Sequence, residues 1–198
     1  MFERGIYNSI VLSHSRSLRE IEVRSLDDVA IARKQASLER LVIDGLSEAL
    51  HIPDLGEASH IKHLAIRNSP GVDDLSFLNS LKSLEIFEFY SDIASSVDFS
   101  ELSSCKNVRK MVVHSPSLTD IDFTTSMPRL SHVDFSESVN LLTVKVLETR
   151  GKKGQSRISW AQLPYSRMYD EVSIVERGRA SGDEIFDPAE DDLILLDD

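Results

Sequence analysis

An apolar triplet with the spacing L-x-x-L-x-L recurs along the middle of the chain. The last two positions of each triplet are two residues apart, which is the period of a strand whose alternate side chains face one side. The first residues of the five copies are separated by 23, 23, 24 and 22 positions. Such a period predicts a solenoid in which each unit buries its apolar edge against the next. The copies are Leu38, Leu41, Ile43; Ile61, Leu64, Ile66; Leu84, Phe87, Phe89; Val108, Met111, Val113; and Leu130, Val133, Phe135.

Short helical turns are predicted between the strands, where apolar residues recur every three positions. These turns lie at 54–59, 75–81 and 99–105. A short helix is predicted within 26–35, with Ser25 as its N-cap. Each unit is also expected to hold a second short extended piece, for example from Leu118 to Phe123 and from Val139 to Val144.

The pattern resembles the leucine-rich repeat family, whose units of about 20–29 residues read L-x-x-L-x-L, and the resemblance covers about two thirds of the chain. The units are similar to irregular, bacterial-like repeats. The resemblance implies an α/β solenoid with parallel strands on the concave face and short helical or 3-10 turns on the convex side. One departure is the absence of the Asn or Cys that usually satisfies the backbone after the strand. The residues at that point are Leu46, Ser69, Asp92, Pro116 and Ser138.

The ends of the chain are less regular than its middle. Tyr7, Ile10 and Leu12 fit the strand spacing and predict a first unit of 31 residues. The amino-acid sequence of segment 14–23 is similar to that of 114–123, so both segments are expected to follow a strand in equivalent places of their repeats. Residues 158–160 and 172–175 are predicted as strands of a cap over the open end. The predicted domains are a solenoid of about six units at 1–147, a small C-terminal capping segment at 148–182 and an acidic tail at 183–198.

The net charge of −11 is unevenly spread along the chain. Residues 183–198 hold eight acids and no base, which leaves 25 acids against 22 bases elsewhere. The solenoid is therefore nearly neutral and lacks the basic footprint that nucleic-acid binding requires. The tail also contains Ile185, Phe186 and the apolar run 193–196. It is interpreted either as a solvated end or as a segment that docks on its own solenoid or on a basic partner.

Cellular location is predicted from what the sequence lacks. No apolar run approaches the roughly 18–20 residues that a bilayer span needs. The first residues, from Met1 to Arg4, do not resemble the start of a secretory signal. Cys105 is the single cysteine, so it excludes an internal disulfide framework. We therefore expect a cytoplasmic protein without membrane association, and its oligomeric state stays open.

The outward positions of the predicted strands form a candidate partner-binding face on the concave side. Its middle column is largely apolar, and its outer columns hold Arg, Tyr and His, a makeup typical of an interface core and its rim. The alternative is that exposed valines on strands merely reflect β-propensity. The candidate residues are Arg40, Val42, Asp44, His63, Arg67, Glu88, Tyr90, Lys110, Val112, His114, His132 and Asp134.

Catalytic and metal chemistry find little support in the sequence. His114 and His132 fall in opposite outer columns, so we expect them to lie more than about 10 Å apart, too far to share a zinc ion. Cys105 occupies a core position of its repeat and is predicted to be structural. No phosphate-binding loop, nucleophile elbow or H-E-x-x-H motif is present. The sequence thus predicts no catalytic residue, cofactor or metal.

A repeat scaffold without catalytic groups favours a protein-binding module over an enzyme. A preformed surface would block or assemble its partner, and the acidic tail would steer a basic one. One version of this hypothesis is an inhibitor or immunity-type protein for a basic enzyme or toxin. The alternative hypothesis is a structural or assembly subunit, an adaptor scaffold that self-associates.

Overall fold

The computed structural model describes residues 18–47, 52–58, 60–92, 97–142, 158 and 160–164. Several predictions fall outside these residues. They concern the strand from Tyr7 to Leu12, the end of the solenoid at 143–147, the strand at 172–175 and the acidic tail.

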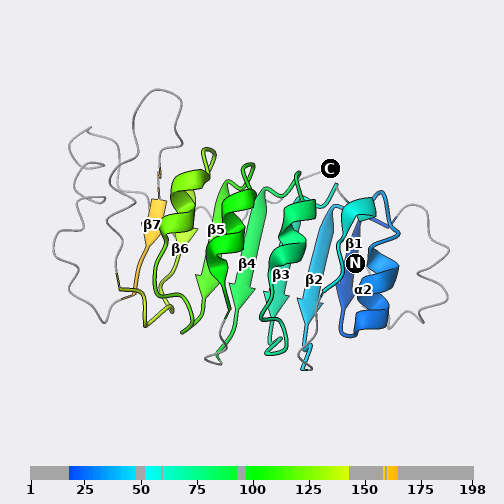
Figure 1. Ribbon diagram of the computed structural model, residues 1–198, viewed down its shortest axis with the longest axis horizontal. Helices are drawn as coiled ribbons and strands as arrows, with labels where there is room; N and C mark the ends of the chain where they lie inside the picture. Colours follow the sequence, from blue (N-terminus) through cyan, green and yellow to red (C-terminus); the bar gives the residue numbers. More distant parts are fainter. Residues whose placement is uncertain are drawn as a thin grey trace, which may run out of the picture.

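The described strands lie side by side in one parallel, seven-stranded sheet whose spatial order is the order of the sequence (Figure 1). Consecutive parallel strands need one return segment per repeat, so this order confirms the predicted solenoid. The strands are β1 (Glu20–Val23), β2 (Arg40–Asp44), β3 (His63–Arg67), β4 (Ile86–Tyr90), β5 (Lys110–His114), β6 (His132–Asp134) and β7 (Trp160–Gln162).

The helical elements all lie on one side of the sheet (Figure 1). Ser25 caps the α-helix as predicted, because its Oγ accepts the Asp28 N–H at 3.2 Å. The three predicted helical turns are also present, and η4 adds another. The elements are α2 (Leu26–Ala32), η1 (Gly56–Ala58), η2 (Ser76–Ser80), η3 (Phe99–Ser104) and η4 (Asp122–Ser126). Within the described residues, every helix is too short or too polar to cross a bilayer.

The entries to three of the 3-10 turns use the same device, an aspartate carboxylate that accepts the N–H two residues further on. It satisfies a donor that the first turn of a helix leaves free. The pairs are Asp74 with Ser76 (2.8 Å), Asp98 with Ser100 (2.9 Å) and Asp120 with Asp122 (3.2 Å).

The core fills the space between the strands and the helical elements. The register places Leu41 beside Leu64 and Leu64 beside Phe87, so equivalent apolar positions stack from one repeat to the next. Phe87 and Phe89 are at most 1% exposed. Phe89 also packs edge-to-face on Phe99, with ring centroids 5.3 Å apart. A continuous apolar stack therefore joins the repeats.

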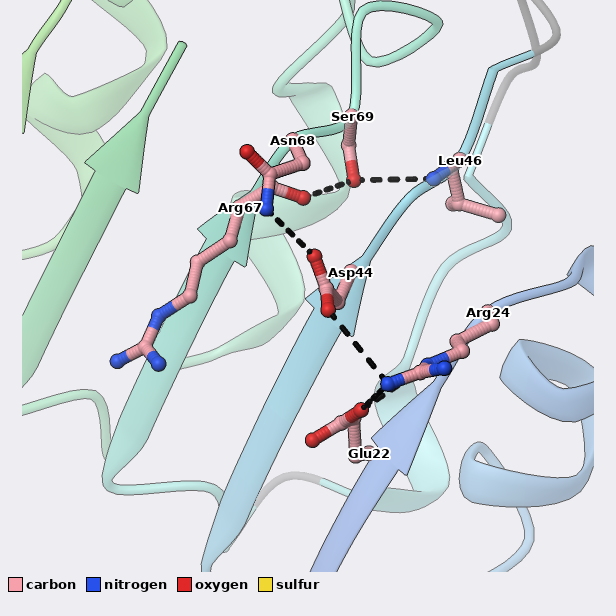
Figure 2. Close-up of polar contacts among 7 residues, drawn as sticks. All are labelled: Glu22, Arg24, Asp44, Leu46, Arg67, Asn68 and Ser69. Carbon is pink, nitrogen blue, oxygen red and sulfur yellow. Dashed lines mark hydrogen bonds and ion pairs between the residues drawn. The ribbon is translucent and has the colours of Figure 1, made fainter. Parts of the chain in front are cut away.

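Serine takes the place of the missing Asn or Cys at the end of β3. Ser69 Oγ accepts the Leu46 N–H at 3.1 Å and donates to the Arg67 carbonyl at 2.7 Å (Figure 2). The hydroxyl is both donor and acceptor, so one side chain satisfies a backbone group in each of two neighbouring repeats. The departure from the family pattern at this position is thus chemically compensated.

Ser138, three repeats further on, also bonds two backbone groups, here both in the preceding repeat, and it is fully buried. Its Oγ accepts the Ser115 N–H at 3.2 Å and donates to the Val113 carbonyl at 2.6 Å. Because Ser138→Ala leaves both groups buried and unsatisfied, we expect a loss of about 1–3 kcal/mol in the free energy of unfolding. Urea denaturation measures this loss. The matched change at exposed Ser47, Ser47→Ala, should leave the midpoint unchanged, and equal midpoints for both variants would contradict the assignment.

The prediction for segment 14–23 is wrong. This segment was expected to follow a strand, as 114–123 does, but its second half forms β1. Glu20–Val23 pairs in parallel with β2, from Glu20 beside Arg40 to Val23 beside Ile43. Leu18, Ile21 and Val23 have the triplet spacing, and Ile21 and Val23 occupy the core positions that pair with β2.

The expected second extended pieces are also corrected. Leu118 to Phe123 forms no strand, and Phe123 lies within η4. In the last unit the buried residue is Leu141, whereas Val139 and Leu142 are 51% and 62% exposed. Residues 118–123 and the described residues 139–142 lie outside the sheet, because the strand place in their repeats is already taken by β5 and β6.

The predicted cap strand at 158–160 is displaced by two residues. β7 runs over Trp160–Gln162 and pairs in parallel with β6. Ile158 is buried and Ala161 and Leu163 pack against the core, so this strand repeats the triplet spacing. The sheet of the solenoid therefore reaches Gln162, and the division of the whole chain into domains stays a prediction.

Candidate functional site

The face of the sheet opposite the 3-10 turns, here called the open face, carries the outward side chains of the strands in three columns. The twelve candidate residues all lie in these columns, and their role in binding stays a prediction. The first column is Glu20, Arg40, His63, Ile86, Lys110, His132 and Trp160. The middle column is Glu22, Val42, Ala65, Glu88, Val112, Asp134 and Gln162. The third column is Asp44, Arg67, Tyr90 and His114.

The apolar stripe of the middle column does not form an exposed interface core. Val42 is 5% exposed, Ala65 0% and Val112 6%. These side chains are short, and they lie between columns of longer polar side chains that cover them. A partner on this face would consequently meet the charged and aromatic side chains rather than the valines.

Glu88 lies at the centre of the open face and is the hub of its ion pairs. Its side chain is 13% exposed, with Oε2 3.2 Å from Arg67 Nη2 and Oε1 3.5 Å from His63 Nε2. The contact with His63 is an ion-pair distance and too long for a good hydrogen bond. Burial by itself raises the pKa of Glu88, but the contacts with His63 and Arg67 outweigh it and lower the pKa to about 2. Glu88 is therefore a carboxylate at every physiological pH.

The ion pairs continue from Glu88 toward β1. Arg40 Nε donates to His63 Nδ1 at 3.2 Å, and Arg40 Nη1 pairs with Glu20. Because Nδ1 accepts this bond, the hydrogen-bond network assigns a ring proton of His63 to Nε2, which faces Glu88. In addition to the backbone hydrogen bonds of the sheet, a chain of side-chain contacts thus links β1 to β4 across the open face.

Aromatic contacts extend the network toward β5. The Arg67 guanidinium lies 5.5 Å from the centre of the Tyr90 ring, a cation–π distance. Tyr90 in turn meets His114 edge-to-face, with ring centroids 5.2 Å apart. Burial, followed by the charge of Glu88, raises the pKa of Tyr90 to about 12, so the phenol stays neutral. These contacts hold both rings in fixed positions.

A serine, a histidine and an aspartate meet at the end of β6 without forming a catalytic relay. His114 Nε2 lies 3.2 Å from Asp134 Oδ1 and 3.5 Å from Ser136 Oγ. In a relay the two partners occupy different ring nitrogens, and the serine donates to the histidine. Here both contact Nε2, and Ser136 Oγ donates to Asp134 Oδ1 at 2.7 Å. The arrangement orders the face and does not activate the hydroxyl.

The N-terminal end of the open face holds charged residues that the sequence analysis missed. Arg24 Nη2 lies 2.7 Å from Glu22 Oε1 and 3.8 Å from Asp44 Oδ2 (Figure 2). Asn68 adds a bond of 3.1 Å from its Nδ2 to Asp44 Oδ1, and its φ of 47° is a left-handed conformation that Asn tolerates. Glu22 and Arg24 were missed because segment 14–23 was expected to follow a strand rather than to form one. The triplet spacing of Leu18, Ile21 and Val23 is the signal that could have located them.

At the other end the sequence analysis missed Trp160, which it assigned to the cap. Its ring stacks on that of His132, with centroids 6.5 Å apart and an interplanar angle of 29°. The spacing of Ile158, Ala161 and Leu163 could have identified the strand, although Ala161 weakens that signal.

The next features are the metal-ligating side chains and the single cysteine. In the described part of the chain, no group of three or more His, Cys, Asp or Glu side chains is arranged to hold a metal ion. Cys105 is buried, and burial raises the pKa of its thiol. Its surroundings match the structural role predicted for it, since a buried thiol in apolar surroundings is a poor nucleophile.

The repeat spacing and the parallel sheet together decide the fold. The chain folds as a leucine-rich repeat solenoid. Each strand presents alternate residues to the core and to the open face, and each return segment between β1 and β6 carries a helix or 3-10 turn on the opposite side.

Three solved structures of similar fold carry leucine-rich repeat or internalin names. The leucine-rich repeat domain of the type III effector XopL matches at 14% identity over 67% of this chain and 57% of its own, with a TM-score of 0.45. Internalin InlF of Listeria monocytogenes matches at 11% over 69% and 52%, with a TM-score of 0.39. Internalin C2 of the same species matches at 15% over 72% and 76%, with a TM-score of 0.31. This chain thus spans little more than half of the first two.

Neither the protein-family models nor the curated proteins contain a match to this chain. The assignment of the fold accordingly rests on the chain's own repeats and sheet.

Proposed function

We propose that this solenoid is a protein-binding module that uses its open face. The observation behind the proposal is the fixed network of charged and aromatic side chains that crosses β1 to β6. Arg and Tyr are the residue types that contribute most to binding energy at protein interfaces, and Arg67 and Tyr90 lie together at the centre of this face. Because their positions are set before binding, these two side chains lose less conformational entropy when a partner binds.

The finer form of the proposal is an inhibitor or immunity-type protein for a basic enzyme or toxin in the cytoplasm. The net charge of −11 supports it, since a strongly acidic chain attracts a basic partner over long distances. Most of that charge belongs to the acidic tail at 183–198, which lies outside the described residues. The tail would then speed the encounter, whereas the open face would form the contact.

Affinity capture from a lysate of the source cells tests the proposal. We expect the full chain to retain a partner protein. The double variant Arg67→Ala, Tyr90→Ala should retain at least about tenfold less of that partner, as expected when residues of a binding hot spot are changed. A chain that ends at Arg179 should capture the same partner more slowly, with a weaker dependence on salt.

The matched control is the double variant Lys106→Ala, Arg129→Ala, which changes exposed residues of the turns before β5 and β6. It should retain the partner fully. Equal loss in both double variants, or full retention in both, would argue against the open face as the contact surface.

The alternative, a self-associating assembly subunit, has one supporting observation. Val139 and Leu142 are large apolar side chains that are more than half exposed beyond β6. Sedimentation velocity over a wide range of concentrations separates the two proposals. A mass that rises with concentration, and that falls back to one chain in Leu142→Ser, would favour assembly.

A further inference from the structure

Most charges on the open face are balanced within it. Each carboxylate of the face contacts a cation or a hydrogen-bond donor, and each guanidinium contacts a carboxylate. The carboxylates are those of Glu20, Glu22, Asp44, Glu88 and Asp134, and the guanidinium groups are those of Arg24, Arg40 and Arg67. Lys110 is the exception, because among the described residues no carboxylate lies within ion-pair distance of its amine.

Lys110 lies in the first column between Ile86 and His132, and Trp160 follows His132. These four residues are called the Lys110 patch. Neighbouring strands are about 4.8 Å apart, so the patch is roughly 14 Å long, the span of four or five extended residues. Lys110 and His132 are exposed, while Ile86 and Trp160 are partly buried. The patch is thus an unpaired cation flanked by apolar and aromatic surface.

His132 adds aromatic surface to the patch. Burial, followed by the nearby charge of Lys110, lowers the pKa of His132 below its usual 6.5. The imidazole is consequently neutral at pH 7, and its stacking on Trp160 presents two rings side by side. Lys110 therefore provides the positive charge of this part of the face.

We propose that the Lys110 patch is the contact centre for a partner segment in which a carboxylate is flanked by apolar side chains. The inference rests on the proposed function and names the chemistry that the open face would select. The carboxylate would pair with the Lys110 amine, and the flanking side chains would cover Ile86 and Trp160. Their cover excludes water from the ion pair and so strengthens it. The negative net charge of the chain attracts a basic partner during approach, whereas Lys110 pairs with a carboxylate only at contact. A partner that is basic as a whole can therefore still present an acidic and apolar segment to the patch.

Fluorescence offers a direct test, because Trp160 is the only tryptophan of the chain. The full chain is titrated with three peptides of equal length that share the same Leu and Phe residues. The remaining positions are all Glu, all Gln or all Lys. We expect the Glu peptide to change the emission of Trp160 and to bind at least about tenfold more tightly than the Lys peptide.

Two charge reversals locate the effect. Lys110→Glu should abolish the preference for the Glu peptide, because it removes the cation of the patch. Lys106→Glu makes the same change in net charge in the turn before β5 and should preserve the preference. Both residues are exposed, and circular dichroism checks that both variants are folded. Equal affinity for the three peptides, no binding of any of them, or equal effects of the two reversals would overturn the proposal.

A chain that ends at Gly182 addresses a competing occupant. The tail at 183–198 is itself acidic and apolar. If removal of the tail raises the affinity for the Glu peptide by about tenfold or more, the tail itself occupies the patch, and the proposal that an external partner binds there is overturned. An unchanged affinity supports the external partner.

The failure of this inference differs from a failure of the proposed function. If capture of the partner depends on Arg67 and Tyr90 but not on Lys110, the open face binds and only the patch assignment is wrong. If neither set of changes alters capture, both proposals fall.

Discussion

Phe87→Ala should lower the free energy of unfolding by about 3–5 kcal/mol, the range found for removal of a buried phenyl ring. Phe87 is fully buried in the central strand β4. The register places it between Leu64 of β3 and Met111 of β5, so the ring joins two repeat boundaries. The cavity left by its removal lies inside the solenoid and cannot fill with side chains from the surface. Urea denaturation monitored by circular dichroism measures the loss.

Phe87→Leu is the matched control, because it keeps an apolar side chain in the same place. Its expected cost is clearly smaller, about 1–2 kcal/mol. Hydrogen exchange should show the loss of protection concentrated in β3 to β5, since each repeat contacts only its neighbours. A loss in Phe87→Ala no greater than in Phe87→Leu would contradict the assigned packing.

Glu88→Gln should remove a pH-dependent part of the stability. The folded pKa of Glu88, about 2, is lower than its ordinary value of 4.5, so the carboxylate stabilises the fold above pH 4.5. This contribution is lost as the pH falls from 4.5 toward 2. Linkage alone gives about 3 kcal/mol, and solvent screening reduces the expected value to about 1–2 kcal/mol at pH 7.

The measurement is the urea midpoint of both proteins between pH 2 and pH 7. The advantage of the unchanged chain over Glu88→Gln should be largest at pH 7 and should vanish near pH 2. Glu137→Gln, a change at an exposed carboxylate, provides the matched control and should give a small difference at pH 7. A difference between the unchanged chain and Glu88→Gln that stays constant over the whole range would rule out the ion pairs of Glu88 as its cause.

The regular strands and the columns of the open face were predictable because their signal is local and repeated. In β2 to β6 a strand starts two residues after the first apolar residue of the triplet, as at Leu38 and Arg40. Equal spacing then puts equal positions side by side, and Arg40, His63 and Lys110 fall into one column. The helix after Ser25 was predictable for the same reason, because its cap and first turn are adjacent in sequence.

The contacts of Glu88 could not be predicted, because they depend on the lengths and rotamers of side chains from neighbouring strands. His63 and Arg67 come from β3, more than twenty positions away. The sequence likewise showed valines on the outward side of the strands. Only the packing of the neighbouring long side chains revealed that Val42 and Val112 are covered.

The segments 18–23 and 118–123 show most clearly where the sequence stops and the tertiary structure decides. Each has apolar residues at the same three positions. The sequence by itself determined the period of the solenoid, its parallel strands, the nearly neutral charge of its repeats and the acidic character of the C-terminal tail. Yet the first segment forms β1, while the second passes through a loop into η4. Each repeat has one place in the sheet, and β5 already fills it four residues before Leu118, whereas β1 itself fills the place beside β2. The choice belongs to the stacking of whole repeats, because backbone hydrogen bonds to a neighbouring strand are available in that place alone.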